Sequence, residues 1–255
     1  RIDLQRRAGG LLLSSGHVDE GLEVMENVLD AIQIRLPKKG LHTIISLLWH
    51  RFRLRFRGLR YRERDESQVS KEELARVDMF HALTDGMAIA DHIKGADLAT
   101  RWLHVALNTG EPLRIFLALC REAGFIAAAG KSRSRYYNHI MGLLTRLLKR
   151  RLHPAGMGWV RSVQAYSTYM RGDWEKARLN AQSAIGIFEE NFSHYWEKVQ
   201  MYFLLMQSNF YLGNVLDMST IGKAALSDAT AKDDLLGISG ILLGLHNLPL
   251  LNSQG

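Results

Sequence analysis

The sequence predicts an all-α protein assembled from stacked pairs of helices, and three observations lead to this prediction. Apolar residues recur at three- and four-residue steps, no segment is best explained as a strand, and short glycine-centred signatures repeat along the chain. Of the 255 residues, 47% are hydrophobic and only 4 are proline, which disfavours both disorder and a turn-rich β protein. We therefore expect a single helical-repeat array over residues 1–255, forming an internal segment of a longer protein.

Two stretches show the helical spacing most clearly. The first has an apolar stripe made of Ile44, Leu47, Leu48, Phe52, Phe56 and Leu59. The second stretch, over residues 72–93, has a stripe made of Leu74, Val77, Phe80, Leu83, Met87 and Ala90. Arginine alternates with apolar residues over 51–57, which taken alone would fit a strand. Because these apolar residues continue the first stripe, we interpret the segment as helix.

The clearest repeat signature is centred on Gly172, which is followed by Asp173 and Trp174. Glycine suits a tight turn between helices because other residues adopt its backbone conformation at a cost. The small residues that follow allow the second helix to approach its partner closely: Ala177, Ala181 and Ala184. Weaker signatures surround Gly16, Gly95, Gly130 and Gly213, Gly58 lies where a missing turn would fall, and Pro112 opens a helix. The units are roughly forty residues long, which exceeds the typical repeat of about 34 residues.

The Gly172 signature resembles tetratricopeptide repeats. This resemblance implies a right-handed α-α superhelix, a solenoid of about six degenerate helical pairs in which the first helix of each pair lines a concave groove. Counting back from Gly172 and Gly213 gives six candidate groove residues: Trp159, Tyr166, Tyr169, Phe203, Gln207 and Phe210. Exposed aromatic rings on a rigid surface suit the recognition of a peptide. The alternative is that each ring packs between stacked helices.

A second resemblance covers residues 51–123. Residues 57–67 read RGLRYRERDES, residues 94–98 read KGADL and residues 110–114 read GEPLR. The pattern also includes Leu74, Asp78, Arg101, Leu103, Ala106 and Leu107. It resembles the repeat region of large bacterial proteins that join a serine/threonine protein kinase domain to an AAA-type ATPase module, although Lys94 and Leu98 depart from the usual arginine and aromatic residue. The resemblance implies a sensory or regulatory segment of a bacterial signalling protein whose kinase and ATP-binding modules lie N-terminal to it.

No catalytic motif is recognisable in the sequence. A kinase would need a His-Arg-Asp loop and an Asp-Phe-Gly motif, but Phe52 follows His50 and Arg51. Residues 129–132 end like a phosphate-binding loop, yet Phe125 stands where that pattern needs glycine, and a helix is expected before it instead of a strand. We therefore expect no catalytic residue and no cofactor in this segment. An enzyme that uses an unfamiliar site is the alternative.

Metal and thiol chemistry are not expected either. The ten histidines show no ligand spacing, and the adjacent Asp91 and His92 point to different faces of a helix. Cys120 lies among apolar residues, which favours a buried thiol over a nucleophile. A single cysteine also excludes an internal disulfide, which favours a reducing, cytoplasmic setting.

The net charge of +7 is concentrated in residues 51–64. On one continuous helix, Arg53, Arg57, Arg60 and Arg64 would share a face, and guanidinium groups suit the phosphates of nucleic acid. Several carboxylates lie close enough in sequence to neutralise this face: Glu63, Asp65, Glu66, Glu72 and Glu73. We favour a solvated face over a nucleic-acid site.

The function predicted from the sequence is a non-catalytic protein-protein interaction and regulatory segment. Its partner would be a protein or peptide ligand, or other domains of its own parent chain. No membrane partner is expected, because no apolar run reaches the length of about 18 residues that spans a bilayer. Two alternatives stay open: a nucleic-acid-binding helical array that uses the arginine face, and a structural spacer or dimerisation module.

Overall fold

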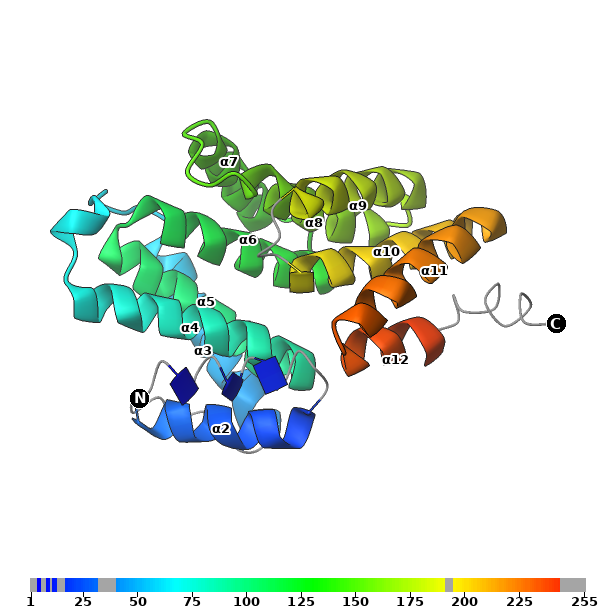
Figure 1. The fold of residues 1–255 in the computed structure, drawn as a ribbon. Coiled ribbons are helices and arrows are strands. Elements are labelled where there is room, and N and C mark those ends of the chain that lie inside the picture. Colours follow the sequence, from blue (N-terminus) through cyan, green and yellow to red (C-terminus); the bar gives the residue numbers. More distant parts are fainter. Residues whose placement is uncertain are drawn as a thin grey trace. The chain divides into compact units, whose positions relative to one another are not determined.

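The computed structural model describes residues 17–31, 40–190 and 195–243, together with the short pieces 4–5, 8–9 and 11–12. Within these residues the structure contains eleven α-helices, one short 3-10 helix and no strand (Figure 1). The prediction of an all-α protein is confirmed. No described helix combines the length and the apolar character that crossing a membrane requires.

The helices are joined by short connections over most of the described chain. In order they are α2 (Val18–Ala31), α3 (Gly40–Arg57), the 3-10 helix η1 (Glu66–Gln68), α4 (Lys71–Ala90), α5 (His92–Thr109), α6 (Pro112–Ala128), α7 (Arg135–Leu148), α8 (Gly156–Tyr169), α9 (Trp174–Glu189), α10 (Tyr195–Leu212), α11 (Val215–Ala231) and α12 (Leu235–Leu243).

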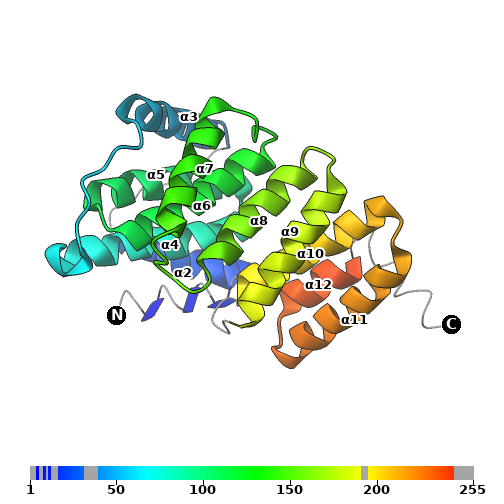
Figure 2. The same cartoon turned by 90° about the horizontal axis from the view of Figure 1, so that it is seen from above.

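The chain divides into two compact units, Arg1–Glu122 and Ala123–Gly255, and the boundary falls inside α6. In the first unit α4 packs against α5, α2 packs against α4, and α3 packs against α5. In the second unit each helix from α8 to α12 packs against the next, and α8 also packs against α10, as α10 does against α12 (Figure 2). The second unit therefore shows regular contacts between successive helices.

Capping residues explain where the helices of the first unit begin. The Ser70 hydroxyl accepts a hydrogen bond of 3.2 Å from the backbone N–H of Glu73, whose carboxylate accepts one from the backbone N–H of Ser70, so α4 begins with a capping box. Asp91 caps α5 by accepting bonds of 3.0 Å from the backbone N–H groups of Ile93 and Lys94. As predicted, α6 begins at Pro112, whose fixed φ suits the first helical position.

Glycines end several of the helices as expected. Gly130, Gly172 and Gly213 follow α6, α8 and α10 with φ values of 71°, 76° and 75°. A residue with a Cβ occupies this left-handed region at a cost, so these turns favour glycine. Gly16 lies outside the described residues.

The interpretation of Gly95 as a turn glycine is wrong. It is buried within α5, because the Asp91 cap starts that helix four residues earlier. The expected helix over residues 72–93 is accordingly split between α4 and α5.

The apolar stripe predicted near residues 44–59 is helical, but most of it faces solvent. Ile44, Leu48, Phe52 and Phe56 are exposed, whereas Thr43 and Leu54 are buried. The physical reason is that polar side chains of α3 bind buried carboxylates of α5 and α6, which turns the more polar side of α3 inward.

Candidate interaction site

The three groove candidates on α8 are half-buried and contact α10. The Trp159 indole N–H donates to Glu197 Oε1 at 3.4 Å, and the Tyr166 hydroxyl donates to Gln200 Oε1 at 3.3 Å. The ring of Tyr169 lies 6.1 Å from the ring of Tyr211. These aromatic side chains therefore lie along the contact between α8 and α10.

The three candidates on α10 have different surroundings. Phe203 is half-buried and packs beside α12, where a Cβ added to Gly240 would lie 2.5 Å from its ring. Gln207 is half-buried as well, whereas Phe210 is 38% exposed. The six candidates thus lie on α8 and α10, but their side chains differ in exposure: five are half-buried and Phe210 is exposed.

Two of the six candidates meet in an aromatic group that we call the turn cluster: Tyr169, Trp174, Phe210 and Tyr211. The Tyr211 ring contacts the other three, stacking on Trp174 at 4.6 Å, meeting the edge of Phe210 at 5.5 Å, and tilting against Tyr169. Tyr211 is nevertheless 51% exposed. A contiguous, partly exposed aromatic surface of this kind marks an interaction site more often than a packing defect.

One member of the turn cluster, Tyr169, has a raised pKa. Burial, together with the neighbouring Tyr211, raises the pKa of Tyr169 to about 12. The hydroxyl therefore stays protonated near neutral pH and can both donate and accept a hydrogen bond.

Two similar turns place the cluster. Gly172 and Asp173 join α8 to α9, with the Asp173 carboxylate accepting a bond of 3.4 Å from the backbone N–H of Lys176. Gly213 and Asn214 join α10 to α11, with the Asn214 side chain donating to Asn209 Oδ1 at 3.1 Å. These turns also carry exposed apolar side chains: Met170, Val215 and Leu216.

The Gly172 signature in the sequence predicts Trp174 at a turn, but it indicates neither the importance of Tyr211 nor the contact between the two rings. The available signal was the alignment of the two glycine turns, which puts both aromatic residues at the same end of successive helices. Their contact depends on α9 and α10 packing side by side, which spacing in the sequence does not specify.

The predicted basic face is not continuous. The expectation that Arg53, Arg57, Arg60 and Arg64 share one helical face is wrong, because α3 ends at Arg57 and Gly58 takes a φ of 74°. The chain over residues 58–65 is not helical, so Arg60 and Arg64 leave the face that carries Arg53.

Two of these arginines bind other parts of the first unit. The Arg57 guanidinium donates to Asn108 Oδ1 at 2.8 and 3.1 Å. Arg64 donates to the backbone oxygen of Gln68 at 2.6 Å and pairs with Glu73 at 3.5 Å. Glu73 is one of the carboxylates that were expected to neutralise the arginines. Arg53 and Arg60 are exposed.

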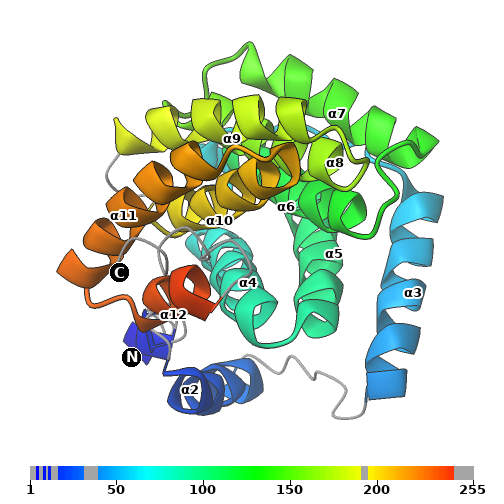
Figure 3. The same ribbon diagram turned by 90° about the vertical axis from the view of Figure 1, so that its right-hand side faces the viewer.

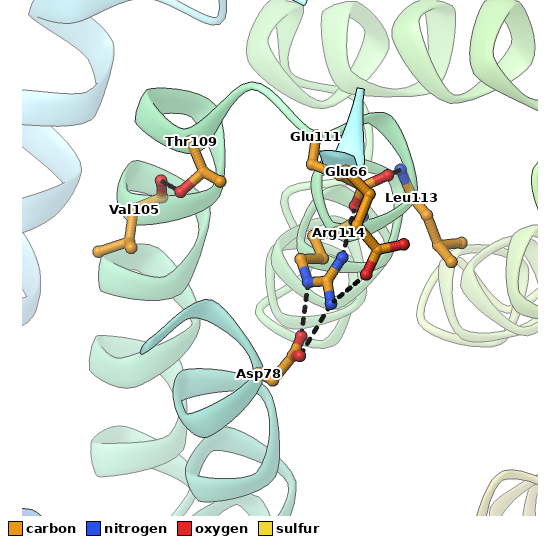
Figure 4. A network of polar contacts seen from close by, with 7 residues as sticks. All are labelled: Glu66, Asp78, Val105, Thr109, Glu111, Leu113 and Arg114. Atoms are coloured by element: carbon orange, nitrogen blue, oxygen red, sulfur yellow. Dashed lines mark hydrogen bonds and ion pairs between the residues drawn. The ribbon is translucent and has the colours of Figure 1, made fainter. Parts of the chain in front are cut away.

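Residues that carry the second resemblance meet in a polar network around Arg114 (Figure 4). The Arg114 guanidinium binds Asp78 at 2.7 and 2.9 Å, Glu111 at 3.2 Å and Glu66 at 3.3 Å. These hydrogen bonds, above all the bidentate bond to Asp78, raise the pKa of Arg114. Glu111 also caps α6 through the backbone N–H groups of Leu113 and Arg114, so the network joins α4 and η1 to the start of α6.

Two further charged groups are enclosed between helices of the same unit. Asp97 is fully buried and accepts hydrogen bonds from Ser46 at 3.1 Å and from Arg101 at 2.7 Å. Glu122 is also fully buried, lies 3.6 Å from Arg51 and accepts a bond of 3.1 Å from Thr100. Burial raises the pKa of Glu122 despite the opposing effect of Arg51.

A third group links α4 to α6. Asp85 pairs with Arg121 and with His81, which lies 3.3 Å away and stacks on Trp102 at 4.4 Å. Burial acts to raise the pKa of Asp85, but the positive charges of Arg121 and His81 outweigh it and lower that pKa. The partners of these charges lie within the unit, so these contacts connect its helices to one another.

The other sequence candidates occupy structural positions. Cys120 is buried, and burial raises the pKa of its thiol, which makes it a poor nucleophile. Residues 129–132 form the turn between α6 and α7 and follow a helix. Across the part of the chain that the structure describes, no three His, Cys, Asp or Glu side chains gather as potential metal ligands.

No family model, no curated protein and no solved structure matches this chain.

Proposed function

We propose that this chain is a non-catalytic protein-interaction segment whose helices form a right-handed, tetratricopeptide-like array. The contacts in the second unit support this architecture. If α8, α10 and α12 are the first helices of successive pairs, then each packs against the next first helix, and α9 and α11 serve as the second helices. The left-handed glycines after α8 and α10 recur in corresponding turns.

The turn cluster is the proposed binding site. The observation that carries this proposal is the position of Tyr211, which contacts three aromatic rings while half of its own surface remains exposed. Rigid aromatic side chains lose little conformational entropy on binding and dominate many protein interfaces. The expected ligand is a peptide segment that presents an apolar or aromatic anchor.

Selection of random linear peptides on the immobilised chain tests this proposal. We expect the enriched peptides to share an apolar or aromatic anchor, and fluorescence anisotropy to give a Kd for each synthetic peptide. Tyr211→Ala and Phe210→Ala should each weaken binding by about tenfold or more, as interface anchors do. The control is Leu179→Ala, which removes an exposed apolar side chain from α9 outside the cluster.

The control variant should bind the peptides as the unaltered chain does. Thermal unfolding of each variant checks that its fold is retained. Enriched peptides that bind the Tyr211 and Phe210 variants with unchanged Kd would place the site elsewhere, and a selection that enriches no sequence would contradict peptide recognition.

A regulatory role in a cytoplasmic bacterial kinase or ATPase is the second part of the proposal. It rests on the resemblance of residues 51–123, and its mechanism would be that ligand binding at the array biases the attached modules. In the full-length parent, a selected peptide should change the rate of autophosphorylation or ATP hydrolysis, and Tyr211→Ala should abolish that change. Equal rates with and without bound peptide would contradict this role while leaving peptide binding intact.

A further inference from the structure

The outer face of α3 is a continuous apolar surface that the turn cluster does not involve. We use this name for six exposed side chains: Leu41, Ile45, Leu48, Trp49, Phe52 and Phe56. Their exposed fractions run from 57% for Ile45 to 89% for Phe56. Trp49 stacks on Phe52 at 6.2 Å and Phe52 on Phe56 at 6.5 Å, so the aromatic rings form an unbroken row.

The opposite side of α3 already contacts the first unit. Leu54 is buried there, Ser46 binds Asp97 of α5, and Arg51 pairs with Glu122 of α6. α3 packs against α5 (Figure 3), and the exposure of the six side chains of the outer face shows that they lie outside this contact. α3 therefore packs against its own unit on one side and exposes apolar side chains on the other. Such an exposed apolar face commonly binds a partner or a membrane surface.

The charged side chains of α3 itself are of one sign. From Gly40 to Arg62 the sequence contains no aspartate or glutamate. The helical repeat places the exposed Arg53 beside Trp49 and the exposed Arg55 beside Leu48, so both margins of the outer face carry a cation.

The histidines in the seam between α3 and α5 favour the neutral form, so they add no positive charge of their own. Burial and the charge of Arg101 lower the pKa of His50, although Asp97 acts in the opposite direction. Burial and the charges of Arg57 and Arg53 lower the pKa of His104. Because Arg53 and Arg55 are exposed and no carboxylate lies between Gly40 and Arg62 in the sequence, a partner of this face should be negatively charged.

Four kinds of partner can be compared with these features. A second copy of the chain would bring like charges together, because arginine accompanies the stripe in each copy. Nucleic acid would use the arginines and the aromatic rings but would leave Leu41, Ile45 and Leu48 exposed. A single acidic helix would cover a narrow seam, whereas the outer face spans roughly 100° around α3, from Leu48 to Trp49, and runs along it from Leu41 to Phe56. An anionic lipid surface accommodates a broad apolar stripe with aromatic rings and arginines at its margins.

We propose that the outer face of α3 lies on an anionic lipid surface, with its apolar side chains between the headgroups and with Arg53 and Arg55 at the phosphates. This mode of binding places the helix parallel to the surface, so it does not require the length of a membrane-spanning segment. This proposal departs from the expectation of no membrane partner, which rested on the absence of an apolar run long enough to span a bilayer.

The test measures co-sedimentation of the full chain with vesicles of phosphatidylcholine alone or mixed equally with phosphatidylglycerol. We expect at least about tenfold stronger binding to the mixed vesicles at low salt and a loss of that preference as salt screens the charges. The variant Phe52→Gln with Phe56→Gln should weaken partitioning by roughly tenfold per ring. The variant Arg53→Gln with Arg55→Gln should weaken it by about fivefold per arginine on mixed vesicles only.

Two controls keep the result specific to α3. Leu216→Gln removes an 86% exposed apolar side chain from α11 and should leave partitioning unchanged. The blue shift of tryptophan fluorescence on mixed vesicles should disappear in Trp49→Phe, which places the contact at this helix among the five tryptophans of the chain.

Each of the following results would overturn the proposal. Equal binding to both kinds of vesicle, or no binding to either, would contradict an anionic lipid surface as the partner. Unchanged binding by the Phe52 and Phe56 variant would show that any lipid contact lies outside the outer face of α3. If vesicles fail to bind, loss in that variant of oligonucleotide binding, of a concentration-dependent dimer in sedimentation velocity, or of binding to an acidic peptide would assign the face to that partner instead.

Discussion

Charged pairs between helices are more prominent in the first unit of the chain than in the second, where Lys198–Asp228 joins α10 to α11. In Arg1–Glu122, charged side chains cross between helices, as in the pairs Arg114–Asp78 and Arg51–Glu122. In Ala123–Gly255, α8, α9 and α10 meet through small and aromatic side chains such as Ala181, Ala184 and Phe188, all of them buried. Apolar contacts tolerate small changes in geometry, whereas a buried charge that loses its partner is left desolvated and unpaired. The difference implies that the two units respond to different substitutions.

Phe188→Ala should have the largest effect, because it opens a cavity in the second unit at a side chain that is only 2% exposed. We expect the free energy of unfolding to fall by about 3–5 kcal/mol. Urea unfolding followed by circular dichroism measures it. The matched control is Phe56→Ala in the first unit, where the side chain is 89% exposed and the change should stay within about 0.5 kcal/mol. Similar losses for the two variants would show that the assigned cores are wrong.

Alanine at a turn glycine should cost more in the first unit than in the second. A Cβ on Gly110 would lie 2.2 Å from the backbone oxygen of Arg62, whereas one on Gly172 would meet nothing nearer than the Trp174 ring at 4.0 Å. Both residues have positive φ, so both substitutions carry a backbone cost of about 1–2 kcal/mol. The clash should bring the loss for Gly110→Ala to about 2–4 kcal/mol.

The same unfolding experiment distinguishes the two turns. Gly186→Ala provides a control, since Gly186 lies within α9 with open space around it and alanine favours a helix. That variant should gain about 0.5–1 kcal/mol. An equal loss of unfolding free energy for Gly110→Ala and Gly172→Ala would mean that the backbone near Arg62 shifts at little cost to accommodate the new Cβ.

Arg114→Met should destabilise the first unit by about 1–3 kcal/mol, because it leaves Glu111 and Asp78 without their cation and removes several hydrogen bonds. Lys176→Met, which removes an exposed pair with Asp173, should leave the unfolding midpoint unchanged. Chemical denaturation at low and high salt measures both. A loss for Arg114→Met that vanished at high salt would indicate a solvent-screened pair instead of an enclosed one.

Glu122→Gln should have the smallest effect at neutral pH and a characteristic pH dependence. Because burial raises the pKa of Glu122 above its ordinary value of 4.5, the folded chain holds this proton more tightly than the unfolded chain. The contribution of Glu122 to stability therefore decreases as pH rises from about 4.5 through the folded pKa.

The variant lacks this titration, so its free energy of unfolding should equal or exceed that of the unaltered chain at pH 7, by about 1 kcal/mol or less. Denaturation at a series of pH values between 4 and 8 gives the comparison. A large loss at pH 7 in the variant would show that attraction to Arg51 outweighs the desolvation of Glu122.

Local signals in the sequence predicted many helix positions correctly. The glycines at 130, 172 and 213 and the proline at 112 act through their own backbone geometry, so their effect is visible without knowledge of the fold. The prediction failed at Gly95, where the nearby Asp91 cap set the helix start. The prediction of one helical face for the four arginines also failed, because α3 ends at Arg57 and the left-handed Gly58 follows it.

The candidate site was predictable in part. Counting from the turn glycines selected Tyr169 and Phe210, which belong to the turn cluster, but it missed Tyr211 at the centre of that cluster. The spacing of the glycines did not predict how exposed the remaining candidates are either. Trp159 and Tyr166, for example, are half-buried and hydrogen-bond to side chains of α10. The resemblance over residues 51–123 selected Asp78, Glu111 and Arg114 without indicating that they bind one another.

The sequence by itself determined the helical class, most of the turns and the absence of recognisable catalytic motifs. These properties depend on the spacing of apolar residues and on backbone preferences, which act over a few residues. Only the tertiary structure decided that α3 turns its polar side inward, that the arginines at 57 and 64 are bound within the first unit, and that four aromatic rings from two turns meet. Those outcomes depend on which residues distant in sequence become neighbours and on the cost of burying a charge without a partner.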